Sequence, residues 1–132
     1  MTDKGYKKLR VYGEAHALVK LIYQATDVFP KSETFGLMSQ MRRSAVSVPA
    51  NIIEGQARSS KKEFRHFLSI ANGSLTELEY YIELSFDLNY IDRKNYEFLN
   101  KQQHAVGMLL GGLIKSLKNL TPWAQQVSAT LR

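Results

Sequence analysis

The residues best suited to acid–base or metal chemistry are three histidines and the carboxylates near one of them. His66 lies close in the sequence pattern to Glu54 and Glu63, and such groups build metal sites and acid–base pairs. His16 and His104 belong to other predicted helices, and no histidine has a partner at HExxH-type spacing. A structural hydrogen bond between His66 and Glu54 explains the cluster better, so we predict no metal and no cofactor.

Other catalytic signatures are missing from the sequence. Glu77 and Glu79 are two positions apart, so they cannot share a helix face as a carboxylate pair. Gly107, Gly111 and Gly112 lie in a helical pattern without a preceding strand, which excludes a phosphate-binding loop. The serines show no nucleophile-elbow motif. We therefore predict that the protein is not an enzyme.

A row of polar residues follows one face of the predicted second helix. If this helix and the third form a hairpin around residues 59–61, facing residues have numbers that sum to about 120. This register places Arg43 opposite Glu77 and Glu54 opposite His66. We predict an inward-facing polar network between the two helices, and ordinary exposed charges are the alternative reading. The row itself contains Gln40, Arg43, Ser47, Asn51, Glu54 and Arg58.

Basic side chains form the second candidate site. The formal net charge of +6 favours acidic partners such as RNA or DNA. Solvated helix ends are the alternative. We expect the N-terminal cluster and the cluster after residue 57 to lie at opposite ends of the molecule, so that only an oligomer would repeat each of them. The candidate nucleic-acid-binding residues are Lys7, Lys8, Arg10, Arg42, Arg58, Lys61, Lys62 and Arg65.

Mostly apolar residues at alternating spacings of four and three, here called seams, predict the helices that position these groups. The seam of the second helix is Leu37, Met41, Ser44, Val48, Ile52 and Gly55, and that of the third is Phe64, Leu68, Ala71, Leu75, Leu78, Ile82 and Ser85. Short connections between helices of similar length favour an all-α, antiparallel up-down-up-down four-helix bundle. We expect a single domain over residues 1–132. Its helices are predicted at about 9–27, 34–57, 61–89 and 92–120, followed by an irregular tail at 121–132.

Several local signals refine these helices. Pro49 falls inside the second pattern and predicts a kink there, with a break and restart as the alternative. Ser32 or Thr34 is the expected cap of the second helix. Ser59 or Ser60 is the expected cap of the third, and Ser60 and Glu63 have capping-box spacing.

Composition limits the class of protein. The chain has 132 residues, of which 44% are hydrophobic, enough for the core of one domain. It contains no cysteine, which is compatible with a reducing cytoplasm. The longest apolar run, residues 106–114, is too short to cross a bilayer, and no signal-peptide pattern is present. We predict a cytoplasmic protein without a membrane partner.

Three long stretches resemble a known bacterial family, the 23S rRNA intervening-sequence or S23 proteins. They are VYGEAHALVKLIYQATDVFP, FGLMSQMRRSAVSVPANIIEGQAR and FRHFLSIANGSLTELEYYI, with the helical segment 106–117 as a further match. The fold is more distantly similar to the accessory protein of diversity-generating retroelements. The motif positions include the polar row, Arg42, Gly73, Ser74 and Glu77, so the resemblance adds Ser74 to the predicted network.

The resemblance implies an antiparallel bundle that assembles into a ring, with a homopentamer favoured. It implies a non-enzymatic protein for which RNA or DNA binding is a proposal. The first hypothesis is accordingly an oligomeric bundle that binds nucleic acid through basic surface. The alternative is a protein-interaction scaffold that docks a partner such as a polymerase, with nucleic-acid binding incidental.

Overall fold

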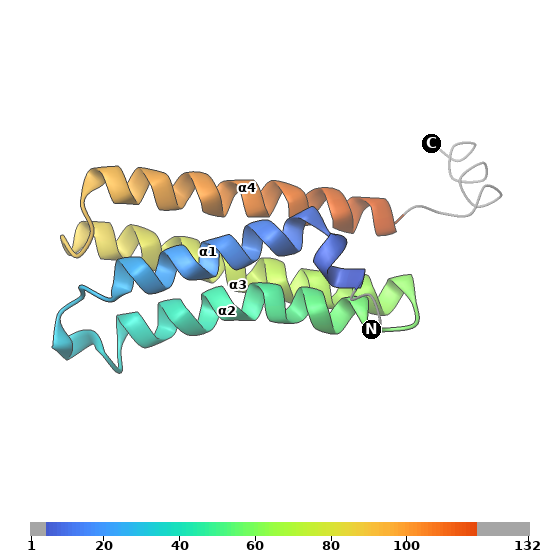
Figure 1. Cartoon of the computed structure of the whole chain (residues 1–132), viewed down its shortest axis with the longest axis horizontal. Helices are drawn as coiled ribbons and strands as arrows, with labels where there is room; N and C mark the ends of the chain where they lie inside the picture. Colours follow the sequence, from blue (N-terminus) through green and yellow to red (C-terminus); the bar gives the residue numbers. More distant parts are fainter. Residues whose placement is uncertain (1–4, 119–132) are drawn as a thin grey trace, which may run out of the picture.

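The computed structural model of the protein describes residues 5–118 and confirms the all-α, up-down-up-down bundle (Figure 1). Lys4, Leu120 and the predicted tail at 121–132 lie outside the described residues. In chain order the elements are η1 (Gly5–Lys8), α1 (Arg10–Thr26), η2 (Lys31–Glu33), α2 (Leu37–Gln56), α3 (Lys61–Asp87) and α4 (Arg93–Leu117).

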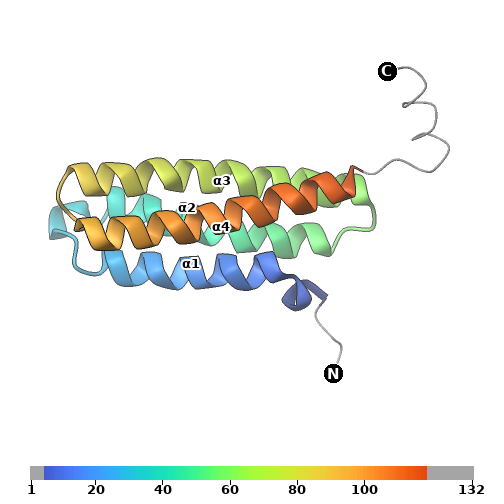
Figure 2. The same ribbon diagram turned by 90° about the horizontal axis from the view of Figure 1, so that it is seen from above.

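Each long helix packs against two neighbours, in the pairs α1–α2, α2–α3, α3–α4 and α1–α4. The two views in Figures 1 and 2 show the four helices side by side with their axes nearly parallel. The heptad positions face the shared core, as periodicity requires. In α2 every predicted seam position is buried, and in α3 all but Phe64, which is half-buried.

The starts of α3 and α4 are fixed by a local side-chain cap, whereas the start of α2 is not. Ser60 accepts a hydrogen bond from the Glu63 amide and Asp92 accepts one from the Asn95 amide, so both side chains cap their helices. The proposed cap at Ser32 or Thr34 is wrong, because η2 intervenes and α2 begins after Gly36 without a side chain in the cap position. Further along, α2 continues through Pro49 without a break.

Glu33 performs the task that the sequence assigned to Ser32 or Thr34. Its Oε1 accepts from the Leu37 amide at 3.1 Å, and its Oε2 accepts from the Tyr90 hydroxyl at 2.9 Å. The carboxylate therefore satisfies a free amide of α2 and ties the α1–α2 connection to the α3–α4 turn. The amide hydrogen bond, followed by the Tyr90 hydrogen bond, lowers the pKa of Glu33 below its ordinary value.

This lowered pKa predicts an acid sensitivity. A carboxylate with a lowered folded-state pKa stabilises the fold fully above its ordinary pKa, and that contribution disappears as the pH falls through the lowered value. Glu33→Gln should therefore reduce the difference in unfolding midpoint between neutral and acidic pH. Urea unfolding at a series of pH values measures this difference. A Glu33→Gln protein that keeps the whole acid dependence of the natural protein would contradict the assignment.

Candidate functional site: a basic end and a polar edge

The two basic clusters lie at the same end of the bundle, and the expectation of opposite ends is wrong. An up-down-up-down chain reverses twice between the start of α1 and the start of α3, so both starts share an end. Figures 1 and 2 show η1 next to the α2–α3 turn. The approach is close, since a Cβ atom on Gly5 would lie 3.0 Å from Gln56 Nε2.

The last turn of α4 joins the same end. Arg65 Nη1 donates to the Leu117 carbonyl at 3.2 Å, which ties the start of α3 to the end of α4. Glu14, Glu54 and Glu63 are the nearby acidic residues. We call this surface the basic end and define it by its exposed side chains: Lys7, Arg10, Arg58, Lys61, Lys62, Lys115 and Lys118. Lys8 also lies in η1.

The other end of the bundle carries the opposite charge. Lys31, Arg93 and Lys94 are interspersed there with a larger number of carboxylates. We call this surface the acidic end, and its exposed carboxylates are Asp27, Glu83, Asp87, Asp92 and Glu97. The excess positive charge of the described residues is therefore concentrated at one end, where it attracts an anionic partner more strongly than an even distribution would.

Arg42 is engaged inside the bundle and does not belong to the basic end. Its Nε donates to Thr26 Oγ1 at 2.9 Å and its Nη2 donates to the Tyr23 carbonyl at 3.2 Å. The guanidinium also lies 4.4 Å from the centroid of the Tyr23 ring. A cation at the last carbonyls of a helix satisfies free acceptors there. Arg42 therefore ties the start of α2 to the end of α1, which is a folding role, and its predicted nucleic-acid contact stays a prediction.

We expect Arg42→Ala to lower the free energy of unfolding by about 1 kcal/mol, because it removes two hydrogen bonds and a cation–π contact. Urea unfolding followed by circular dichroism measures the loss. Arg43→Ala is the matched control, since its neighbouring guanidinium is more exposed and should contribute less. Unchanged stability of Arg42→Ala together with weakened RNA binding would return Arg42 to the binding surface.

The first part of the predicted polar row joins α2 to α3. Arg43 Nη2 donates to Glu77 Oε1 at 2.8 Å, and the same guanidinium donates to Gln40 Oε1. The Tyr81 hydroxyl also donates to Glu77 Oε1 at 2.7 Å, which raises the pKa of Tyr81. Sequence reasoning missed Tyr81, although it lies one turn after Glu77 on the same helix face.

The middle of the row is formed by smaller groups. Ser47 Oγ and Ser74 Oγ are 2.8 Å apart across the α2–α3 interface. Asn51 Nδ2 donates to the Ser47 carbonyl at 2.8 Å and to Ser47 Oγ at 3.0 Å. The three side chains are half-buried, so their pairing matters to the register of the two helices.

The expected pairing of Glu54 with His66 is wrong. Glu54 accepts instead from Arg58, four residues later in the α2–α3 turn, and the Arg58 guanidinium lies 4.8 Å from the centroid of the Phe67 ring. His66 is exposed and contacts the same phenyl ring edge-on. A partner four residues away in the chain needs no alignment between α2 and α3, which explains why Arg58 replaces His66.

The predicted inward-facing network is therefore a row of three separate groups along an exposed edge. Across residues 5–118 no hydrogen bond joins these groups to one another. The side chains of Arg43 and Glu77 are 60% and 39% exposed, so the charged part of the row faces solvent. The row aligns α2 with α3, and only its serine and asparagine part is shielded from water.

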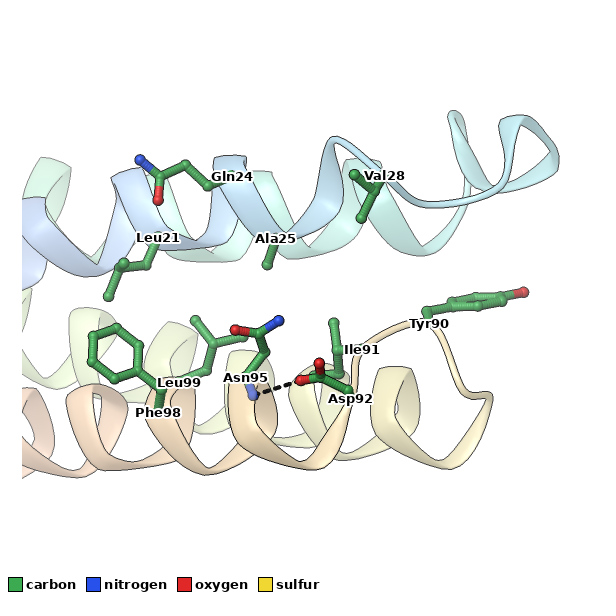
Figure 3. A pocket seen from close by; sticks show the side chains of 10 residues that line it. All are labelled: Leu21, Gln24, Ala25, Val28, Tyr90, Ile91, Asp92, Asn95, Phe98 and Leu99. Carbon is green, nitrogen blue, oxygen red and sulfur yellow. Dashed lines mark hydrogen bonds between the residues drawn. The ribbon is translucent and has the colours of Figure 1, made fainter.

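A cavity with a volume of about 520 Å³ lies between α1 and α4 at the acidic end (Figure 3). Leu21 and Val28 line the α1 side of this cavity, and Phe98 lines its α4 side. Its single carboxylate, Asp92, accepts the Asn95 amide at 2.8 Å as the cap of α4. No acid–base pair lines this cavity, and the described part of the chain holds no cluster of three metal-ligating side chains. Between residues 5 and 118, no helix is long and apolar enough to span a membrane.

Comparisons with known proteins agree with this fold. Residues 7–112 match the family described as 23S rRNA-intervening sequence protein. A crystal structure of a protein of unknown function from the S23 ribosomal protein family of Bacteroides thetaiotaomicron is similar, with a TM-score of 0.72 and 29% sequence identity. That similarity covers 80% of this chain and 95% of the other. None of the curated proteins compared with this chain matches it.

Proposed function

Because this chain belongs to the 23S rRNA-intervening sequence protein family, we propose that it is a non-enzymatic helical bundle that binds RNA or DNA through its basic end. The observation that carries the proposal is the convergence of η1, the α2–α3 turn and the end of α4 at one basic surface. Lysine and arginine at such a surface contact phosphates without regard to base sequence.

The side chains of the basic end suit phosphate contact. Lys61 and Lys62 are exposed in the first turn of α3, and Lys7 and Arg10 are exposed on the neighbouring segment. Within residues 5–118 these four side chains form no ion pair. Arg58, which is bonded to Glu54, keeps part of its guanidinium in solvent. A phosphate backbone would therefore displace counterions at this end and break few existing contacts.

The proposal includes a homo-oligomer, with a homopentamer favoured by the resemblance to the S23 proteins. Exposed apolar side chains on α3 and α4 support it, since a contact between subunits would bury them. Tyr80 is 58% exposed and Met108 is 67% exposed, and Ile70 is another such residue. A ring of parallel subunits would place all the basic ends on one rim. We propose a cytoplasmic location, supported by the absence of cysteine.

A protein-interaction scaffold is the second candidate function. The observation that favours it is the set of apolar side chains at the acidic end. Phe35 is 95% exposed, and Val28, Leu88 and Phe98 are also exposed there. A partner protein such as a polymerase would bury these side chains, and its binding would depend weakly on salt.

Salt-titrated binding separates the two functions. Fluorescence anisotropy with mixed RNA and DNA fragments should show affinity that falls steeply and linearly on a log–log plot against salt concentration. If the protein binds neither RNA nor DNA even at low salt, the nucleic-acid-binding function is rejected and the protein-interaction scaffold is the function that stands.

A further inference from the structure

An apolar groove between α1 and α2 begins next to the basic end. Its volume is about 220 Å³. The α1 wall has three members, Tyr12, His16 and Val19, which repeat at helical spacing. The α2 wall consists of small and branched apolar side chains: Val46, Pro49, Ala50 and Ile53. The groove is therefore separate from the polar edge, which lies on the α3 side of α2.

Aromatic rings form the part of this groove nearest the basic end. The rings of Tyr12 and His16 are stacked, with centroids 6.0 Å apart and an interplanar angle of 7°. Tyr6 of η1 packs edge-on against Tyr12 at 5.0 Å. His16 is exposed, so one end of this aromatic row is accessible to a ligand. The same short η1 segment thus contributes Lys7 to the basic end and Tyr6 to the aromatic row.

The charges around the groove are positive. No carboxylate lines it. Lys20 follows His16 by one helical turn on the same face, and its side chain is exposed. An anionic chain that reaches the basic end would therefore meet no repulsion as it continues along α1.

We propose that this groove binds the bases of single-stranded RNA or DNA whose phosphates contact the basic end. The inference rests on the proposed function and adds a substrate class to it. Single-stranded nucleic acids bind where a basic surface tracks the backbone and aromatic rings stack on unpaired bases. A duplex keeps its base faces stacked internally, so it would contact the basic end alone. The protein should consequently prefer single strands to duplexes of equal charge.

Anisotropy titrations of the natural protein and of His16→Ala test the proposal. The probes are labelled oligouridylate and oligothymidylate, with a self-complementary hairpin of equal length as the duplex. His16→Ala should weaken binding of the single strands by at least about fivefold, the expected loss of one stacking contact. Duplex affinity and the salt slope of binding should be unchanged, because the phosphate contacts remain. His104→Ala on α4 is the matched control, since its imidazole is equally exposed and lies outside the groove.

A second variant, Ala50→Trp, fills the groove from an exposed position on α2. It should lower single-strand affinity while circular dichroism shows a folded helical protein. Equal affinity for single strands and duplexes, with both variants neutral, would overturn the inference and leave the basic end as the binding surface. The inference would also be overturned if Ala50→Trp formed a smaller oligomer in solution, measured by molar mass, and kept its affinity for oligonucleotides. That result would show that a second copy of the chain occupies the groove. Failure of every probe to bind would instead contradict the proposed function itself.

Discussion

Reversal of the charges of Lys61 and Lys62 to glutamate is expected to weaken RNA and DNA binding by roughly 10- to 100-fold at moderate salt. Both side chains are exposed in the first turn of α3, at the centre of the basic end. The double variant replaces two phosphate contacts by two repulsive charges, so the salt slope should also become shallower by about two. Anisotropy titrations at several salt concentrations measure both quantities.

The matched control is Lys31→Glu with Lys94→Glu, which makes the same change in net charge at the acidic end. Both of these lysines are exposed, so neither substitution disturbs the core. Long-range attraction alone predicts a similar loss of affinity in the two double variants. If binding occurs at the basic end, the control should lose affinity only a few-fold. Salt screens the attraction between charges that are farther apart than a Debye length of about 8 Å, so the distant acidic end contributes little. Equal losses would show that binding follows net charge without a defined surface.

Gly55→Ala is expected to lower the free energy of unfolding by about 2 to 3 kcal/mol. A Cβ atom on Gly55 would lie 2.9 Å from Phe67 Cβ, 2.9 Å from Phe64 Cδ1 and 3.2 Å from the Phe64 carbonyl oxygen. The first and last of these atoms belong to the rigid part of α3. The absent side chain is thus what lets the end of α2 approach the start of α3, beside the basic end.

Gly111→Ala provides the opposite expectation. Gly111 lies inside α4, and no atom of another element comes within 4 Å of its Cβ position, so alanine should add about 0.5 to 1 kcal/mol of stability through its higher helix propensity. Urea unfolding of both variants gives the two free energies. Stabilisation by both substitutions would mean that α2 and α3 separate readily at Gly55. That result would contradict the close approach on which the basic end depends.

The fold followed from the sequence wherever the determining interactions are periodic or local. The heptad spacing of Met41, Val48 and Ile52 identified the buried face of α2, and Ser60 identified the start of α3. The register between α2 and α3 also followed, because a short turn fixes which residues face each other. Arg43 and Glu77 are accordingly in contact.

The features that could not be predicted depend on tertiary contacts or on competition between partners. Glu33 holds the start of α2 because Tyr90, far along the chain, reaches the same carboxylate. The sequence placed Arg42 among the exposed basic residues, because only the packing of α2 against α1 brings its side chain to Thr26. For Glu54 two partners were available, and the local one, Arg58, prevailed. The shared location of the basic clusters, by contrast, was predictable, because it follows from the up-down-up-down topology once both helix reversals are counted.

Hydrogen–deuterium exchange with and without a bound oligonucleotide tests the central claim most directly. The claim is that nucleic acid contacts the end formed by η1, the α2–α3 turn and the end of α4. Amides in residues 5–9 and 57–62 lie outside the middle of the long helices, so they should exchange quickly in the free protein. The account predicts that these segments gain protection on binding while residues 27–36 and 88–92 at the acidic end do not. Protection confined to the acidic end would contradict it.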